Sequence, residues 1–382
     1  MTITTSSDLD QLADLAARSV ALIESLQHVD GAYPASPTFS AYQGYSWFRD
    51  GAFIADGMSA AGAVESASRF FDWCSRILEK RRDRVAEIVA AAAAGTPLPD
   101  DRMLATRFTF DGDEGDDDWW DFQTDGYGTW VWACITHADR HGLDLDRWVE
   151  GIRLSVDYLL ATWSRPCYDW WEEHAAETHV STLGCVIAGL ESAARADVLT
   201  ASAESASISA AASARGLIAE RGTHDGHVSK WLGSTAVDGS LSAVIAPLGV
   251  VEATSPLGLA SIRAIETQLS VDGGVHRYLL DTFYGGGQWP LLSCFLGLAH
   301  ARAGDREAAL RLLCWAARTE TDGGSLPEQV PDHLLAPERR DEWLERWGPV
   351  ATPLLWSHAM FVRLAVELDV LRPSRRSAGV IA

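Results

Sequence analysis

Apolar residues recur every three to four positions along almost the whole chain, and this spacing sets the fold class. In residues 8–26 they form one face, which predicts an amphipathic helix. Two-residue alternation is scarce, and no Asn-Gly or Asp-Gly turn lies between convincing strands. We therefore predict an all-helical chain of about twelve helices, the others covering 50–63, 65–94, 126–141, 146–163, 179–195, 199–220, 240–249, 255–269, 289–303, 305–318 and 352–370.

Long connecting segments separate these helices. They are acid- and Trp-rich at 111–120, Gly- and His-rich at 222–239, Gly-rich at the end of 270–288 and Pro-containing at 320–351. Loops of this length in a compact domain usually have a function. About twelve helices with such loops on one face fit an α/α toroid, and no fixed-period repeat supports a helical solenoid instead. Since no segment resembles a linker, we predict one domain over 1–382.

Charge and cysteine content exclude several classes of partner. The net charge is −22, and basic residues do not cluster, which argues against nucleic-acid and anionic-membrane partners. No apolar stretch is long enough to span a bilayer, and the first residues contain no signal region. The six cysteines include no C-x-x-C pair and lie mostly in apolar helical contexts, as free buried thiols do. We expect a cytoplasmic protein whose oligomeric state the sequence leaves open.

Motifs for metals and cofactors are missing from the sequence. It contains no H-E-x-x-H, no Cys/His cluster and no G-x-S-x-G elbow. The glycine run 285–287 lacks the lysine and the strand–turn–helix context of a phosphate loop. We therefore expect no metal and no cofactor.

Two distant segments carry carboxylates in unusual settings. One reads Y-D-W-W-E-E over 168–173, and the other reads G-S-L-P-E-Q over 324–329. Taken alone, the first resembles a solvated acidic face and the second an ordinary loop glutamate. Indoles beside a carboxyl group remove water from it and raise its pKa, as a general acid requires. Cleavage of a glycosidic bond needs one protonated and one ionised carboxyl group, so the pair suggests glycoside hydrolysis.

Other residues suit sugar binding. In the segment Y-S-W-F-R-D (45–50), Asp50 can accept hydrogen bonds from sugar hydroxyls while Arg49 donates one. The alternative is that Asp50 caps the helix that follows. Among 16 tryptophans, the pairs at 119–120 and 170–171 lie beside acids in loop-like sequence, where flat rings suit a pyranose face.

In combination, these segments resemble glycoside hydrolase family 15, the glucoamylase family. Any one motif is weak, but the set appears in the family's order from about residue 45 to 360. The motifs are Y-S-W-F-R-D (45–50), Q-T-D-G (123–126), Y-D-W-W-E-E (168–173) with H-V-S-T (179–182), R-Y-L-L-D-T-F-Y (277–284) with Q-W-P (288–290), L-P-E-Q (326–329) and P-L-L-W-S-H-A (353–359).

The resemblance implies a single (α/α)6 barrel with a pocket at one end, acting on non-reducing ends with inversion. Glu172 would be the general acid and Glu328 the general base. The substrate-binding residues would be Tyr45, Trp47, Arg49, Asp50, Trp120, Trp171, Glu173 and Arg277. The chain departs from the pattern at Gln43, where fungal members of the family have an aromatic residue near the catalytic water.

The expected function is therefore exo-acting hydrolysis of a short α-glucoside with release of β-glucose. The chain lacks the additional modules of many relatives and is similar to the members that act on isomaltose, which we take as the expected substrate. Trehalose, maltose and short dextrans remain alternative substrates. An α/α-barrel sugar epimerase, an unsaturated-uronide hydrolase and a non-catalytic sugar-binding protein are the alternative functions.

Overall fold

A computed structural model describes residues 6–119 and 121–373 of the chain. Helices dominate this part, as the periodicity predicts. The α-helices are α1 (Ser6–Leu26), α2 (Phe48–Ala60), α3 (Val64–Lys80), α4 (Arg82–Ala93), α5 (Asp125–His141), α6 (Val149–Thr162), α7 (Val180–Arg195), α8 (Ala201–Arg221), α9 (Leu241–Ile245), α10 (Pro256–Leu269), α11 (Pro290–Arg302), α12 (Arg306–Arg318), α13 (Arg340–Trp347) and α14 (Leu355–Glu367).

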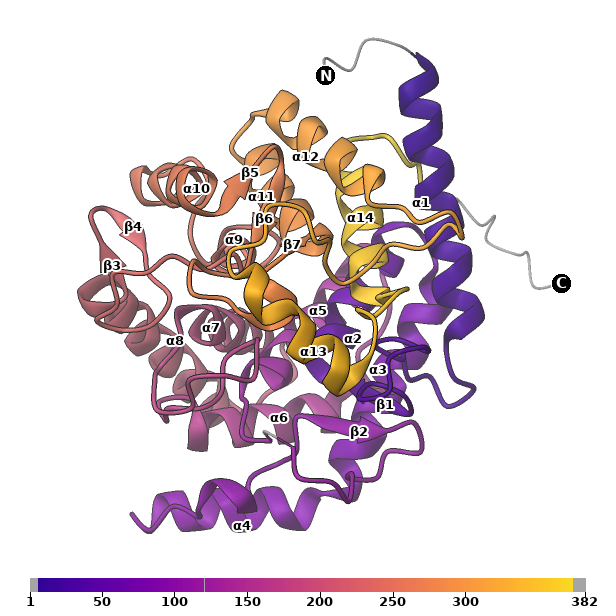
Figure 1. The fold of residues 1–382 in the computed structure, drawn as a ribbon. Helices are drawn as coiled ribbons and strands as arrows, with labels where there is room; N and C mark the ends of the chain where they lie inside the picture. The colour runs from indigo at the N-terminus through magenta and orange to yellow at the C-terminus, as the bar shows by residue number, and fades with distance from the viewer. Residues whose placement is uncertain (1–5, 120, 374–382) are drawn as a thin grey trace, which may run out of the picture.

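Six of these helices form a closed inner ring. Helix α2 packs on α5, α5 on α7, α7 on α9, α9 on α11 and α11 on α14, and α14 returns to α2. Helices α1, α3, α6, α8, α10 and α12 pack on the outside of this ring (Figure 1). The alternation of inner and outer helices confirms the predicted (α/α)6 barrel.

The sequences of the helices explain which of them lie inside. Every residue of α2 is buried, whereas α8 buries only Ser207, Ala210, Ala211, Ala214 and Ile218. Most residues of α2 are apolar or small, and its charged residues Arg49, Asp50 and Asp56 are in ion pairs, so this helix can lie in the interior. Glycines let the inner helices approach closely, since a Cβ atom on Gly189 of α7 would lie 2.5 Å from the Gly128 oxygen of α5.

The structure corrects three expectations about secondary structure. Segment 65–94 is two helices, α3 and α4, which are separated at Arg81. Helix α13 lies within the loop expected at 320–351; it is only eight residues long, and its apolar residues Trp343, Leu344 and Trp347 pack on the core without being fully buried. Two Asp-Gly turns do join strands, at Asp225-Gly226 and Asp272-Gly273, with positive φ at all four residues. Their strands are too short for visible alternation.

The strands form small antiparallel sheets at the loops. Strand β1 (Tyr45–Trp47) pairs with β2 (Arg107–Thr109), and β3 (Thr223–His224) pairs with β4 (His227–Val228). Strand β6 (Gly274–His276) lies between β5 (Ser270–Val271) and β7 (Gln288–Trp289). Among the described helices, none combines the length and the apolar character needed to cross a bilayer. All six cysteines are free, and five of them are buried.

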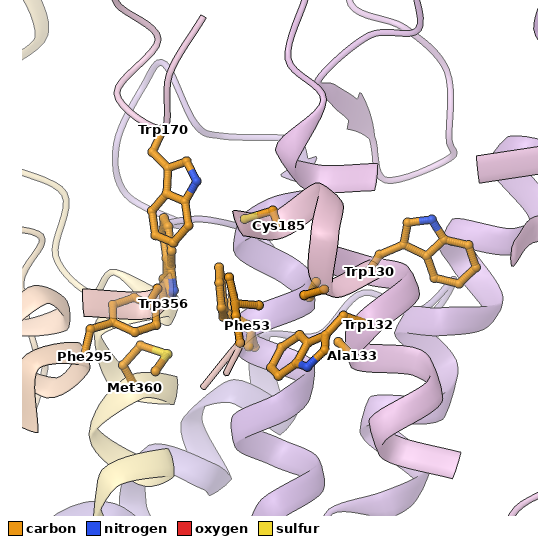
Figure 2. Close-up of a cluster of buried hydrophobic side chains, with 14 of the residues drawn as sticks. Phe53, Trp130, Trp132, Ala133, Trp170, Cys185, Phe295, Trp356 and Met360 are labelled. Atoms are coloured by element: carbon orange, nitrogen blue, oxygen red, sulfur yellow. The ribbon is translucent and has the colours of Figure 1, made fainter. Parts of the chain in front are cut away.

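An aromatic cluster fills the ring where α2, α11 and α14 meet the loops (Figure 2). Phe53 of α2 stacks on Trp356 of α14, with ring centroids 5.5 Å apart and planes at 11°. Trp170 lies 5.3 Å from Phe53 and 5.5 Å from Trp356. Trp170 and Trp356 also line the cavity described below, so the core forms its floor.

Candidate active site

A cavity of about 330 Å³ opens at the loop end of the ring. Its lining includes eight tryptophans, which come from loops, from strands β1 and β7 and from helices α13 and α14. The volume and the mixture of aromatic and charged groups are those of a small-molecule site. It brings together eight of the ten site residues predicted from the sequence, namely Trp47, Arg49, Asp50, Trp171, Glu172, Glu173, Arg277 and Glu328.

Two predicted residues are not part of this lining. Tyr45 lies behind the wall, because the Arg107 guanidinium is stacked 3.8 Å from its ring and 3.7 Å from the ring of Trp119. The Tyr45 hydroxyl donates to Asp117 Oδ1 at 3.1 Å, outside the cavity. Trp120 lies outside the described residues. Its neighbour Trp119 lines the cavity instead.

Glu172 lies on one wall with its carboxyl group held by three donors. Trp47 Nε1 donates at 2.8 Å, Trp119 Nε1 at 3.1 Å and Gln123 Nε2 at 3.3 Å. Among the described residues, all these bonds fall on Oε1. The side chain is only partly buried. Oε2 accepts none of these three bonds.

The segment around Glu172 is not a solvated acidic face, which excludes that alternative. Asp169, Trp170 and Trp171 are all buried. Asp169 Oδ1 accepts the backbone N–H groups of Trp171 at 3.0 Å and Glu173 at 2.9 Å. These bonds close a tight turn in which Glu172 has φ of +62°.

Glu328 lies in the same cavity but in a drier setting. Its carboxyl group is 2% exposed, Oε1 accepts a hydrogen bond from the Tyr42 hydroxyl at 2.9 Å, and Oε2 is buried without a hydrogen-bond partner. Burial raises the pKa of Glu328 to about 8, against the opposing effects of the Tyr42 hydrogen bond and the Arg277 charge.

The loop that carries Glu328 is held by α14. His358 Nε2 accepts the N–H of Leu326 at 2.8 Å, and Ser357 Oγ donates to the Pro327 carbonyl at 2.8 Å. His358 Nδ1 then carries the ring proton and donates it to Ser19 Oγ, at 2.8 Å. Burial lowers the pKa of His358 to about 3, so this anchor stays neutral over the ordinary pH range.

Tyr42 was not among the residues predicted from the sequence. Its ring meets the ring of Trp47 edge-on, with centroids 5.4 Å apart. Since Trp47 binds Glu172 and Tyr42 binds Glu328, one aromatic pair holds both carboxyl groups. Gln43, where an aromatic residue was expected, instead donates to the Pro37 carbonyl at 2.8 Å and does not line the cavity. The aromatic residue that contacts Glu328 is Tyr42, one position earlier.

Arg49 and Asp50 lie in the first turn of α2. Trp47 is the N-cap of this helix, so Asp50 is not its cap and that alternative is wrong. Arg49 donates to Gln123 Oε1 at 2.6 Å, and its Nε lies 3.3 Å from Asp50 Oδ2. That contact lacks hydrogen-bond geometry, so both atoms are buried without a hydrogen-bond partner. Burial, which outweighs the Arg49 charge, raises the pKa of Asp50 to about 6.

Arg277 lies on the other side of the cavity in an ion-pair cluster. It pairs with Asp281 through Nε at 2.8 Å, and its Nη2 lies 3.3 Å from Glu173 Oε1. The Tyr278 hydroxyl donates to the other oxygen of Glu173. Glu173 is therefore fixed at both carboxyl oxygens.

One group among the described residues has the spacing of metal ligands. Ligand atoms of Asp169, Glu173 and His174 lie within 4.8 Å of one another. However, Lys230 Nζ lies 3.4 Å from Asp169 Oδ2, and Arg277 is paired with Glu173. These protein cations balance the carboxylates, so the cluster is accounted for by ion pairs.

Comparison with known proteins gives a consistent picture. The sequence model of glycosyl hydrolases family 15 matches residues 13–319. An isomaltose glucohydrolase of Kribbella flavida is 53% identical over 374 residues, covering 98% of this chain and 97% of that protein. A solved glycosidase variant in complex with glucose has a TM-score of 0.94 at 53% identity, covering 97% of this chain and 100% of that one.

More distant structures share the fold. A glucoamylase of Saccharomycopsis fibuligera has a TM-score of 0.70 at 14% identity, over 96% of both chains. A bacterial glucoamylase solved with acarbose has a TM-score of 0.74 at 19% identity, covering 94% of this chain and 56% of that one. The chain therefore belongs to glycosyl hydrolases family 15 and is a glycoside hydrolase.

Proposed function

We propose that this enzyme releases β-glucose from the non-reducing end of isomaltose with inversion, using Glu172 as general acid and Glu328 as general base. The observation that carries the proposal is that one edge-to-face pair, Trp47 and Tyr42, holds both carboxyl groups on a single cavity. An inverting pair should be about 6.5–9.5 Å apart, which leaves room for a water molecule.

In this mechanism Glu172 gives its proton to the glycosidic oxygen as the bond to the anomeric carbon breaks. A water molecule attacks that carbon from the opposite face, and Glu328 takes the proton that the water loses. Because burial raises the pKa of Glu328 to about 8, this carboxyl group must ionise before it can act as a base. We therefore expect kcat/KM to rise with pH up to that region.

The cavity floor supports recognition of a terminal glucose. Arg49 Nε and Asp50 Oδ2 are buried without hydrogen-bond partners, a costly state that sugar hydroxyls would relieve. Trp343 and Trp347 of α13 narrow the cavity, which favours short substrates. The 53% identity to an isomaltose glucohydrolase supports isomaltose over trehalose, maltose and short dextrans. Family membership disfavours an epimerase, an unsaturated-uronide hydrolase or a non-catalytic sugar-binding protein.

We also propose that residues 1–382 act as one catalytic domain in the cytoplasm. A single cluster of buried apolar residues runs through the described helices, which supports one domain. None of the six cysteines is in a disulfide, as is usual in reducing compartments.

The test compares two substrates with different needs for an acid. Isomaltose needs a protonated leaving group, whereas fluoride leaves α-glucosyl fluoride without a proton. Glu172→Gln should lower kcat on isomaltose by about 10²–10⁴-fold and spare the fluoride, whereas Glu328→Gln should lower both. Proton NMR in the first minutes should show β-glucose.

Each other outcome contradicts a defined part of the proposal. The α-anomer appearing first would exclude inversion. A fluoride-sparing Glu328→Gln variant would exchange the two roles. Activity on trehalose or maltose but not on isomaltose would correct the substrate, and inactivity on all of them would refute the glucosidase.

A further inference from the structure

Lys230 is an unusual residue in this chain. Lys80 and Lys230 are the only lysines in the sequence, whose basic residues number 31. Lys80 is exposed on α3, whereas Lys230 is 3% exposed and follows β4. A buried ammonium group is costly unless anionic partners surround it. Its partners Asp169, Asp238 and Tyr278 in turn contact residues on either side of Glu172.

Three groups surround the ammonium. Lys230 Nζ lies 2.7 Å from Asp238 Oδ2, 3.4 Å from Asp169 Oδ2 and 3.4 Å from the ring centroid of Tyr278. Asp238 is fully buried, which would raise its pKa, but the Lys230 charge and several hydrogen bonds keep that pKa below the usual value. The lysine ammonium is a compact point charge, whereas arginine would bring a larger planar guanidinium with a different geometry of donors.

Two of the three partners hold the indole and the backbone beside the general acid. Asp238 accepts a hydrogen bond from Trp171 Nε1, with distances of 3.1 and 3.0 Å to its two oxygens. Asp169 accepts the backbone N–H groups of Trp171 and Glu173. Trp171 and Glu173 are the two sequence neighbours of Glu172. Through Asp238 and Asp169, the ammonium therefore fixes the loop on both sides of Glu172.

The third partner holds the neighbouring carboxylate. The Tyr278 hydroxyl donates to Glu173 Oε2, and the Lys230 ammonium lies over the Tyr278 ring. Lys230 therefore connects to both neighbours of Glu172, although it does not line the cavity itself.

The backbone of Glu172 needs such support. Its φ of +62° is in the left-handed region, which costs a residue other than glycine about 1–2 kcal/mol. The Glu172 N–H donates to the Asp169 carbonyl at 3.0 Å, so the turn closes on Asp169 itself. If Asp169 moved, the acid could relax towards an ordinary conformation with its carboxyl group displaced.

We propose that Lys230 is a positioning residue for the general acid: it holds Asp169, Asp238 and Tyr278 so that Glu172 keeps its left-handed conformation and meets the glycosidic oxygen. The inference rests on the proposed function. It predicts a specific defect, in which proton donation to the leaving group fails while attack by water on the opposite face continues.

The test measures kcat for Lys230→Met on isomaltose and on α-glucosyl fluoride. We expect a loss of about 10–100-fold on isomaltose, which needs the acid, and less than about threefold on the fluoride, which does not. Lys80→Met is the matched control and should leave both rates unchanged. Lys230→Arg should not restore the rate on isomaltose, because its larger planar guanidinium has a different geometry of donors.

Two buried carboxylates without a cation can prevent folding of the single variant. The charge-balanced variant Lys230→Met/Asp238→Asn removes one charge of each sign, and circular dichroism checks its fold. It should show the same loss confined to isomaltose. An equal loss on both substrates in a folded variant, or no loss on isomaltose, would overturn the proposal. Failure of wild-type enzyme on both substrates would refute the proposed function instead, before any variant is compared.

Discussion

The two loops that carry Glu172 and Glu328 are built in opposite ways. The acid loop, residues 168–174, is held by charges, with the Lys230 ammonium between two buried aspartates. The base loop, residues 326–330, is held by neutral groups, namely the His358 ring, the Ser357 hydroxyl and backbone bonds to Gln288 and Ala351. Glu172 therefore lies on a loop that buried ion pairs hold in place, whereas Glu328 lies on a loop that neutral hydrogen bonds hold in place.

The settings of the two carboxyl groups differ as well. Glu172 is partly exposed and accepts three hydrogen bonds on one oxygen, whereas Glu328 is 2% exposed and accepts one from Tyr42. Burial without full hydrogen bonding disfavours the charged form of Glu328. The comparison teaches that two glutamates on one cavity can have very different surroundings, which differ in exposure and in the number of hydrogen bonds that each carboxyl group accepts.

The largest expected effect is on the stability of the folded protein, when Glu328 is replaced by glutamine. In the folded state Glu328 has a pKa of about 8 against an ordinary 4.5, so the folded chain holds a proton that the unfolded chain loses between these values. Stability from this group is complete below about pH 4.5 and is lost as pH rises through 8. Glu328→Gln should thus be more stable than the wild type by roughly 2–4 kcal/mol at pH 8, with no gain near pH 4.5.

Thermal denaturation of both proteins across this pH range measures the difference. Glu220→Gln, a change at an exposed site on α8, is the control and should show no pH-dependent gain. A difference that is independent of pH would mean that Glu328 is not protonated in the folded enzyme.

The next effect concerns the single hydrogen bond that Glu328 accepts from Tyr42. This bond lowers the pKa of Glu328, so Tyr42→Phe should raise that pKa further and move the acid limb of kcat/KM to higher pH. Hydrogen bonds to charged groups contribute about 1.5–3 kcal/mol, which corresponds to a loss of roughly 10–100-fold in rate. Tyr33→Phe, which loses a hydroxyl bound to Ser66, is the control. If the acid limb of kcat/KM in Tyr42→Phe stays in place or moves to lower pH, the Tyr42 hydrogen bond does not lower the pKa of Glu328.

The smallest expected effect is that of His358→Phe, which distinguishes the groups that hold the Glu328 loop from those that hold the Glu172 loop. His358→Phe leaves the Leu326 N–H and the Ser19 hydroxyl buried without partners, which should cost about 1–3 kcal/mol of stability and reduce kcat several-fold. Because the base is displaced, isomaltose and α-glucosyl fluoride should lose activity equally, unlike in the Lys230 variant. His358→Gln keeps an acceptor near the Nε2 position and should restore most of the rate. A loss confined to isomaltose would mean that the two supports are not independent.

Some features of the site left a local mark in the sequence and others did not. The acid segment was recognisable because Trp170 and Trp171 lie beside its carboxylates. Tyr42 has no acidic neighbour in the sequence, and its partner Glu328 lies 286 residues away. Tyr45 was expected in the cavity but lies behind Arg107, because the pairing of β1 with β2 places that cation in front of it. Helix α13 escaped prediction because it buries no complete apolar face.

The sequence by itself determined the helical fold and the segments that carry the two glutamates. Those features follow from local spacing and from residue types that stand next to one another. Only the tertiary structure decided that Tyr42 and Trp47 contact the two carboxyl groups, that burial raises the pKa of Glu328, and that Lys230 lies between Asp169 and Asp238. These depend on distances and desolvation between residues far apart in the chain, which no local pattern encodes.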